Sequence, residues 1–97
     1  MSLGTFAFAK IKLQKQVQGL GLVMKGEITN NGGKNYHAVV FRAVVFIKSI
    51  AVGNITFVLN GFNSGQTREF EAQMGELQYD KIIRDVSRFE LYAESGY

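Results

Sequence analysis

Side chains that commonly carry out acid–base or nucleophilic chemistry are scarce in this sequence. His37 is the only histidine, and there is no cysteine. A zinc site needs three or four protein ligands, mostly cysteine and histidine, so this composition argues against one. A Ser-His-Asp triad assembles in space, and sequence spacing does not exclude it. Because His37 follows a turn rich in glycine and asparagine, however, we expect a solvated histidine at the start of a strand.

The carboxylates Glu69 and Glu71 have the spacing of two residues on one face of a strand. Strand geometry places them about 7 Å apart, which is within the range of carboxyl separations in glycosidases. Every polar strand face has this spacing, so we assign no catalytic role to the pair. We predict that the chain is not an enzyme and that it uses no metal, cofactor or small-molecule substrate.

Four lysines could bind a polyanion, namely Lys10, Lys12, Lys15 and Lys25. Residues 1–53 hold seven basic residues and one acid, whereas residues 54–97 hold four basic residues and seven acids. A basic stripe on the first strands could bind single-stranded nucleic acid if the chain formed an OB-like barrel. Alternatively, the two halves interleave in space and their charges pair across strands. The aromatic residues near the lysines lie on apolar stripes rather than among the charges, so we keep the OB-like binder as the alternative hypothesis.

The elements that would position these side chains are strands. Apolar and polar residues alternate along most of the chain, which is typical of half-buried strands. A helix would place residues two apart on opposite sides of its axis and would scatter these stripes. The clearest alternating segments are Leu20–Thr29, Asn54–Asn60, Thr67–Met74 and Val86–Ala93. His37–Ser49 is apolar on most of both faces, which predicts the central strand of a sheet.

Two segments deviate from a simple strand. Phe6 and Phe8 share one face, but Leu13 falls on the other, which predicts a bulge near Ala9–Lys10. The Leu77–Asp85 segment alternates weakly, and a helical turn also fits it. We expect a loop followed by a short strand there.

Turn-forming glycine and asparagine clusters recur about every ten residues, and proline is absent. This pattern predicts an all-β fold, an antiparallel immunoglobulin-like β-sandwich of about seven strands with Greek-key connections. We expect a single domain over residues 1–97, with residues 1–4 derived from cloning. With 46% hydrophobic residues and eight phenylalanines, the chain can form a core without disulfides. The predicted core comprises Leu22, Met24, Ile28, Phe41, Val45, Phe57, Leu59, Phe70, Phe89 and Leu91.

A glycine, a strand ending at asparagine, a short polar loop, an aromatic residue and a long alternating strand follow one another from Gly26 to Phe46. The residues of this motif are Gly26, Ile28, Asn30, Tyr36, Val40, Val44 and Phe46. A second block places Phe62, Gly65 and Phe70 in "FVLNGFNSGQTREFEAQM", and "RFELYAES" closes the pattern. Over residues 20–93 the chain resembles the FxLYD family, small immunoglobulin-like domains of exported bacterial and archaeal proteins. It departs from the family at Ile47 and Lys48, where the family signature has tyrosine and aspartate.

The resemblance implies a non-catalytic structural or protein-interaction module in an exported or envelope-anchored prokaryotic protein. The expected partner is another protein or a neighbouring domain of the parent chain, and nucleic acid is not the favoured partner. An export signal would lie outside the present sequence. The longest apolar run, Ala43–Ile47, is far shorter than the roughly 20 residues that span a bilayer as a helix, so we predict no membrane span. An exposed edge strand could also pair with a copy of itself.

Overall fold

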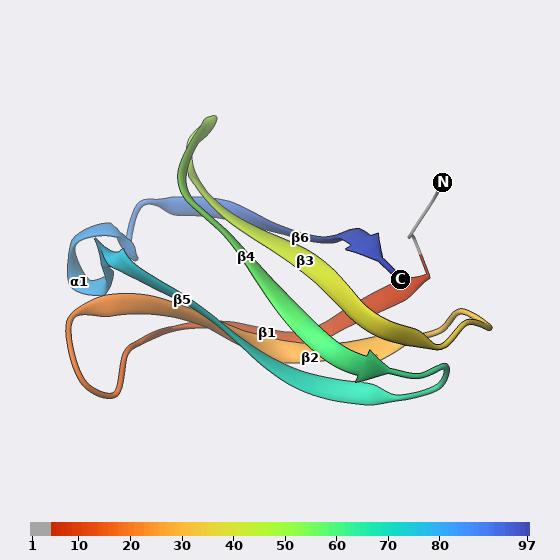
Figure 1. Ribbon diagram of the computed structural model, residues 1–97. Helices are drawn as coiled ribbons and strands as arrows, with labels where there is room; N and C mark the ends of the chain where they lie inside the picture. The colour runs from red at the N-terminus through yellow and green to blue at the C-terminus, as the bar shows by residue number, and fades with distance from the viewer. Residues whose placement is uncertain (1–4) are drawn as a thin grey trace.

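The computed structural model describes residues 5–97, which form six strands and one short helix. In chain order the elements are β1 (Phe6–Lys15), β2 (Gly21–Asn30), β3 (Tyr36–Ile47), β4 (Ile50–Phe62), β5 (Thr67–Gln78), α1 (Tyr79–Ile82) and β6 (Val86–Gly96). Two three-stranded antiparallel sheets have the orders β1-β2-β5 and β4-β3-β6 (Figure 1). The predicted all-β, antiparallel class is confirmed. The prediction for residues 1–4 lies outside the described residues.

The prediction of about seven strands is wrong by one, and the difference lies in the Leu77–Asp85 segment. β5 continues to Gln78, and the chain then forms the single turn α1 instead of a short strand. The Ile83 amide donates to the Tyr79 carbonyl at 3.0 Å, and the Tyr79 amide donates to the Leu20 carbonyl at 2.9 Å. Tyr79 and Ile82 are half-buried against the core. Packing of two apolar side chains on one side of this turn therefore favours the helical conformation.

The two sheets pack face to face, and aromatic rings fill the space between them. Phe41 on β3 is fully buried and lies at the centre, 5.2 Å from the Phe6 ring and 5.5 Å from the Phe57 ring between centroids. Phe57 in turn stacks on Phe70 of the opposite sheet at 5.0 Å. This cluster joins β1, β3, β4 and β5 in one core.

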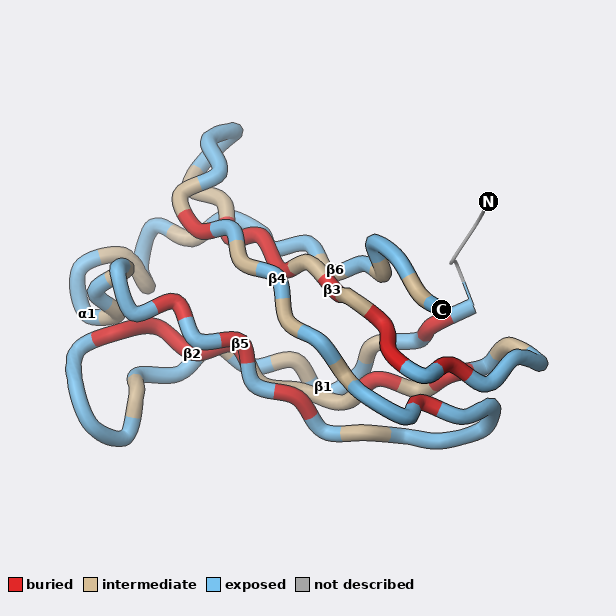
Figure 2. Tube along the Cα trace, viewed as in Figure 1, coloured by how far each residue is buried: buried red, intermediate tan, exposed pale blue. Residues whose placement is uncertain are grey.

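The predicted core is confirmed as buried for Leu22, Met24, Ile28, Phe41, Val45 and Phe70. Phe57, Leu59 and Leu91 are half-buried and pack against it. The prediction that Phe89 belongs to the core is wrong, since this residue is 40% exposed. It lies on the edge strand β6, which has no buried residue (Figure 2). An inward-facing side chain on an edge strand stays open when no neighbouring strand covers it.

The predictions for β3 and β1 are confirmed. β3 is the central strand of its sheet, and Val44 on its outer face is buried along with the inner residues. On β1 the pairing with β2 shifts register between Ala9 and Lys12, and Lys10 adopts a left-handed φ of 56°. This bulge changes the phase of the strand and lets Leu13 pack against the core along with Phe8.

Asn30, at the end of β2, is the buried polar residue of the core. Its side-chain amide donates to the carbonyls of Lys34 at 2.9 Å and Phe62 at 3.3 Å, and its Oδ1 accepts from the Gly32 amide at 3.0 Å. Its own carbonyl accepts from the Gly65 amide at 2.8 Å. Through its side chain and its backbone, this one residue therefore holds the β2–β3 and β4–β5 connections together.

The β3–β4 hairpin gives a stability prediction. Ile47 pairs with Ile50, so Lys48 and Ser49 form a two-residue loop. Lys48 has a φ of 56°, whereas Ser49 does not have a positive φ, as in a type II′ turn, which prefers glycine at the first position. We expect Lys48→Gly to raise the free energy of unfolding by about 0.5–1 kcal/mol, measured by urea denaturation. Ser49→Gly is the control and should not stabilise; equal gains from both variants would contradict this explanation.

Candidate functional site

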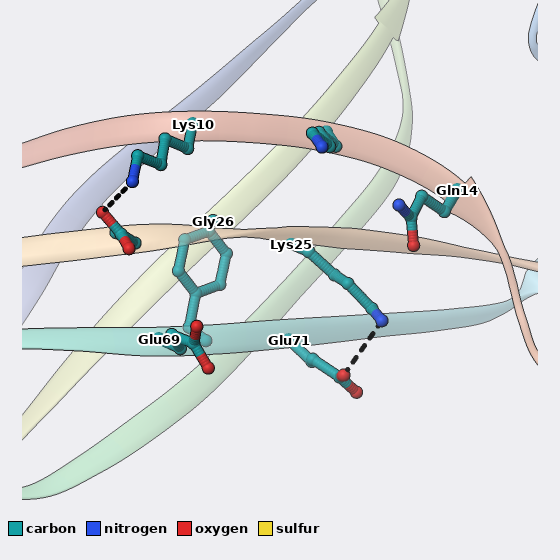
Figure 3. Close-up of a pocket in the computed structure, with 9 residues that line it drawn as sticks. Lys10, Gln14, Lys25, Gly26, Glu69 and Glu71 are labelled. Carbon is teal, nitrogen blue, oxygen red and sulfur yellow. Dashed lines mark ion pairs between the residues drawn. The ribbon is translucent and has the colours of Figure 1, made fainter.

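Three of the four lysines proposed to bind a polyanion lie on the outer face of the β1-β2-β5 sheet. Lys10, Lys12 and Lys25 line a shallow depression with a volume of about 410 Å³. Figure 3 shows the side chains around it, with Lys25 and Glu71 directed toward each other. Lys15 lies at a neighbouring depression of about 350 Å³, which it shares with Lys25. Lys15, however, pairs with the buried Leu22 on β2, which places it on the core-side face of the sheet, where it reaches Asp80 of α1. The structure thus brings three of the four lysines to one sheet face.

The floor of the larger depression is apolar and depends on a glycine. Gly26 and Phe70 lie beneath the charged side chains. A Cβ at Gly26 would lie 2.4 Å from Ile11 Cδ1 and 3.0 Å from Phe70 Cε1. A larger residue would displace Ile11 and crowd Phe70, so glycine is favoured where these two side chains approach the β2 backbone.

The charges of this face are largely compensated by carboxylates. Lys10 pairs with Glu27 at 3.7 Å, and Lys25 pairs with Glu71 at 3.3 Å. The depression is lined by three lysines and three glutamates, so its formal charge is zero. A polyanion would have to compete with these carboxylates.

Pairing between the basic and acidic halves of the chain extends beyond the depression. Lys15 pairs with Asp80 at 2.7 Å, and Arg42 pairs with Glu94 at 2.8 Å. In each case the base comes from the first half of the sequence and the acid from the second. The uneven charge distribution therefore supports ion pairs between the two halves of the chain, each worth at most about 1 kcal/mol at exposed positions.

The residues considered for catalysis do not converge. His37 is exposed on β3, while Glu69 and Glu71 lie on the outer face of β5 in the opposite sheet. Within residues 5–97 there is no group of three or more His, Asp or Glu side chains that could hold a metal ion. In the same span, no helix has the length and apolar character needed to cross a bilayer.

The outer face of the β4-β3-β6 sheet has a different character, which sequence analysis did not single out. Val58 on β4 is 50% exposed and pairs with Val40 on β3. Tyr92 on β6 is 42% exposed and pairs with Arg42. We call these four residues the outer patch. The signal in the sequence was the second apolar face of His37–Ser49, which we used only to place the strand in the middle of its sheet.

Arg42 ties the three strands of this sheet together at the outer patch. Its guanidinium binds Glu94 through Nε at 2.8 Å and Nη2 at 3.2 Å. Nη1 donates to the Asn54 side chain on β4. The hydrogen bond to Glu94 raises the pKa of Arg42 above its usual value. The guanidinium therefore stays charged and is held in one orientation beside Tyr92.

At the hairpin end of the same face, a second arginine covers an aromatic ring. The Arg88 guanidinium lies 3.7 Å from the centroid of Phe46, and Arg88 also pairs with Glu90. This stacking shields much of the ring from water. Apolar surface on this face is therefore concentrated at the outer patch.

No family model matches the chain, and comparisons with curated proteins and with solved structures found no match. Function must therefore be inferred from the two sheet faces. One is charged and internally compensated, and the other combines an oriented arginine with exposed tyrosine and valine side chains.

Proposed function

We propose that this chain is a non-catalytic interaction module that binds another protein, or a neighbouring domain of its parent chain, through the outer patch. The observation that carries the proposal is the exposure of Val58 and Tyr92 beside Arg42 on a solvated sheet face. The uncovered face of an antiparallel sheet is usually polar. Tyrosine and arginine are enriched at protein interfaces.

The opposite outer face supports this choice by contrast. Around Lys12 and Lys25 it presents exposed charged and amide side chains that pair with one another. Such a face is already well solvated and gains little from burial against a partner. The outer patch, by comparison, offers exposed apolar area whose burial is favourable, at about 25 cal/mol per Å².

The strand order also supports the immunoglobulin-like part of the proposal. In the lettering of that fold, β1-β2-β5 corresponds to strands A, B and E, and β4-β3-β6 corresponds to C′, C and F. The resemblance to FxLYD domains is consistent with this order and suggests an exported or envelope-anchored parent protein. The genomic reading frame tests the location, since a frame without an export signal, lipobox or membrane anchor would exclude it.

Binding through the outer patch is tested by Tyr92→Ala. A partner is first captured from the source cells by cross-linking, and its affinity for the purified chain is then measured. Tyrosine is enriched among the hot-spot residues of interfaces, whose truncation costs about 2 kcal/mol or more. We therefore expect binding to weaken at least about 30-fold, with unchanged unfolding behaviour.

Lys12→Ala on the opposite sheet is the matched control and should leave the affinity unchanged. The same variant distinguishes this proposal from the alternative function, the binding of a polyanion through the lysines. If Lys12→Ala weakens binding and Tyr92→Ala does not, and if binding to single-stranded DNA falls steeply with salt, the polyanion hypothesis replaces the present one. Equal affinity of the wild type, Tyr92→Ala and Lys12→Ala for the partner would also overturn the proposal that the outer patch binds it.

A further inference from the structure

The strand β4 has a free edge with little protection from Asn54 to Val58. Among residues 5–97 it pairs only with β3, and its 13 residues include no charged residue and no proline. Its one register shift against β3 lies between Ala51 and Gly53, outside this stretch. Within the described chain, each of the other three edge strands has such protection. β1 has lysines and a bulge. β5 contains Arg68, Glu69 and Glu71, and β6 contains Arg88 and Glu90. Natural edge strands use charges, bulges and proline to prevent pairing with other chains.

The ladder of the β4-β3-β6 sheet shows which backbone groups of β4 are free. Ala38 on β3 donates to Tyr97 at 3.2 Å and accepts from it at 3.1 Å, so its backbone groups point toward β6. Backbone groups of successive strand residues point to opposite edges. Those of Phe41 therefore point toward β4, where its partner is Phe57. Phe57 uses its amide and carbonyl within the sheet.

The residues on either side of Phe57 have the opposite orientation. The amides and carbonyls of Thr56 and Val58 point away from β3, toward the unpaired edge. An independent contact supports this assignment, because Arg68 Nη1 donates to the Asn60 carbonyl at 2.9 Å. Asn60 lies two residues after Val58, so its backbone groups point to the same edge as those of Thr56 and Val58. Its carbonyl therefore faces the unpaired edge. Arg68 thus covers one end of the edge and leaves Asn54–Val58 free.

We propose that β4 pairs antiparallel with β4 of a second copy of this chain, which joins two three-stranded sheets into one continuous six-stranded sheet. A two-fold axis near Thr56 places this stretch of β4 beside the same stretch of the second copy. A charged residue near the axis would therefore lie close to the same charge in the other chain. The absence of charge on β4 removes that repulsion. The exposed outer side would bring the two Thr56 hydroxyls together, and the half-buried Ile55 would cover Phe57 of the other copy on the inner side.

This inference goes beyond the proposed function, because it uses backbone groups at the edge rather than the side chains of the outer patch. An interface of one strand pair is small, so we expect a reversible dimer that forms with increasing concentration. Sedimentation of the wild-type chain should show this dimer below about 1 mM. A monomer throughout that range would overturn the proposal.

The variant that tests the edge is Thr56→Lys. Thr56 is exposed, points outward and lies opposite Arg42 on β3. The substitution sets two lysines of the dimer against each other, and urea unfolding of the monomer measures the separate effect of the lysine beside Arg42. We expect dimerisation to weaken at least tenfold. Ser95→Lys is the matched control, because Ser95 is an exposed residue on β6 at the opposite edge of the same sheet. An equal loss in both variants would contradict the proposal.

Cysteine cross-linking gives a second readout, since the chain has no cysteine of its own. Directly opposed strand residues lie about 5.5 Å apart at their α-carbons, which suits a disulfide. Under mild oxidation Thr56→Cys should form a covalent dimer, and Ser95→Cys should not. Faster cross-linking by Asn54→Cys or Val58→Cys would move the axis along the same edge and support the pairing. Fastest cross-linking at position 95 would overturn it.

Discussion

Replacing Phe41 with alanine should lower the free energy of unfolding by about 3–5 kcal/mol. Phe41 is fully buried on the central strand, and its ring lies within 6.2 Å of four other phenylalanine rings between centroids. Those rings come from β1 and β4, so both sheets lose contacts. A domain of this size is stabilised by roughly 5–15 kcal/mol in total. The variant should therefore unfold at a much lower urea concentration.

Phe46→Ala is the matched control, because Phe46 lies on the same strand but on the outer face beside Arg88. Its loss removes one cation–π contact and little buried surface, so we expect a decrease of about 1 kcal/mol. Urea unfolding followed by tyrosine fluorescence measures both variants. If Phe46→Ala destabilises as much as Phe41→Ala, the core does not lie between the two sheets as described.

The strands could be predicted from the sequence because side-chain alternation is a local property. The apolar faces of β3 indicated a central strand, and the phase change after Phe8 indicated the bulge at Lys10. The exposure of Phe89 could not be predicted in this way. Its alternation gives the direction of the side chain, whereas its exposure depends on whether another strand lies beside β6.

The surfaces could be predicted only in part, for a similar reason. The sequence suggested one basic stripe of four lysines, but Lys15 pairs with the core residue Leu22 and lies on the other face from Lys12 and Lys25. Strand spacing also did not identify the partners of the lysines. Glu71 and Asp80 lie far from Lys25 and Lys15 in the sequence and become neighbours only through the pairing of β2 with β5 and the position of α1. The outer patch has the same origin, because Tyr92 and Val58 reach Arg42 and Val40 from two different strands.

Replacing Asn30 with alanine should have the second large effect, a loss of about 2–4 kcal/mol in the free energy of unfolding. The side chain is fully buried, and its removal leaves the carbonyls of Lys34 and Phe62 and the amide of Gly32 without their partner. A buried polar group that loses its hydrogen bond destabilises the fold by more than the bond itself contributed. Hydrogen exchange should report faster opening of both connections, since Gly65 also binds the backbone of Asn30.

Two further variants identify the donated hydrogen bonds as the cause. Asn30→Asp has nearly the same shape, but it replaces the donor amide with a carboxylate oxygen that faces the Lys34 and Phe62 carbonyls. We expect it to be at least as destabilising as Asn30→Ala, because it buries a charge against two acceptors. Asn31→Ala, at the exposed neighbouring position, should change stability by less than about 0.5 kcal/mol. If Asn30→Asp were as stable as the wild type, the side-chain amide would not be what holds the two connections together.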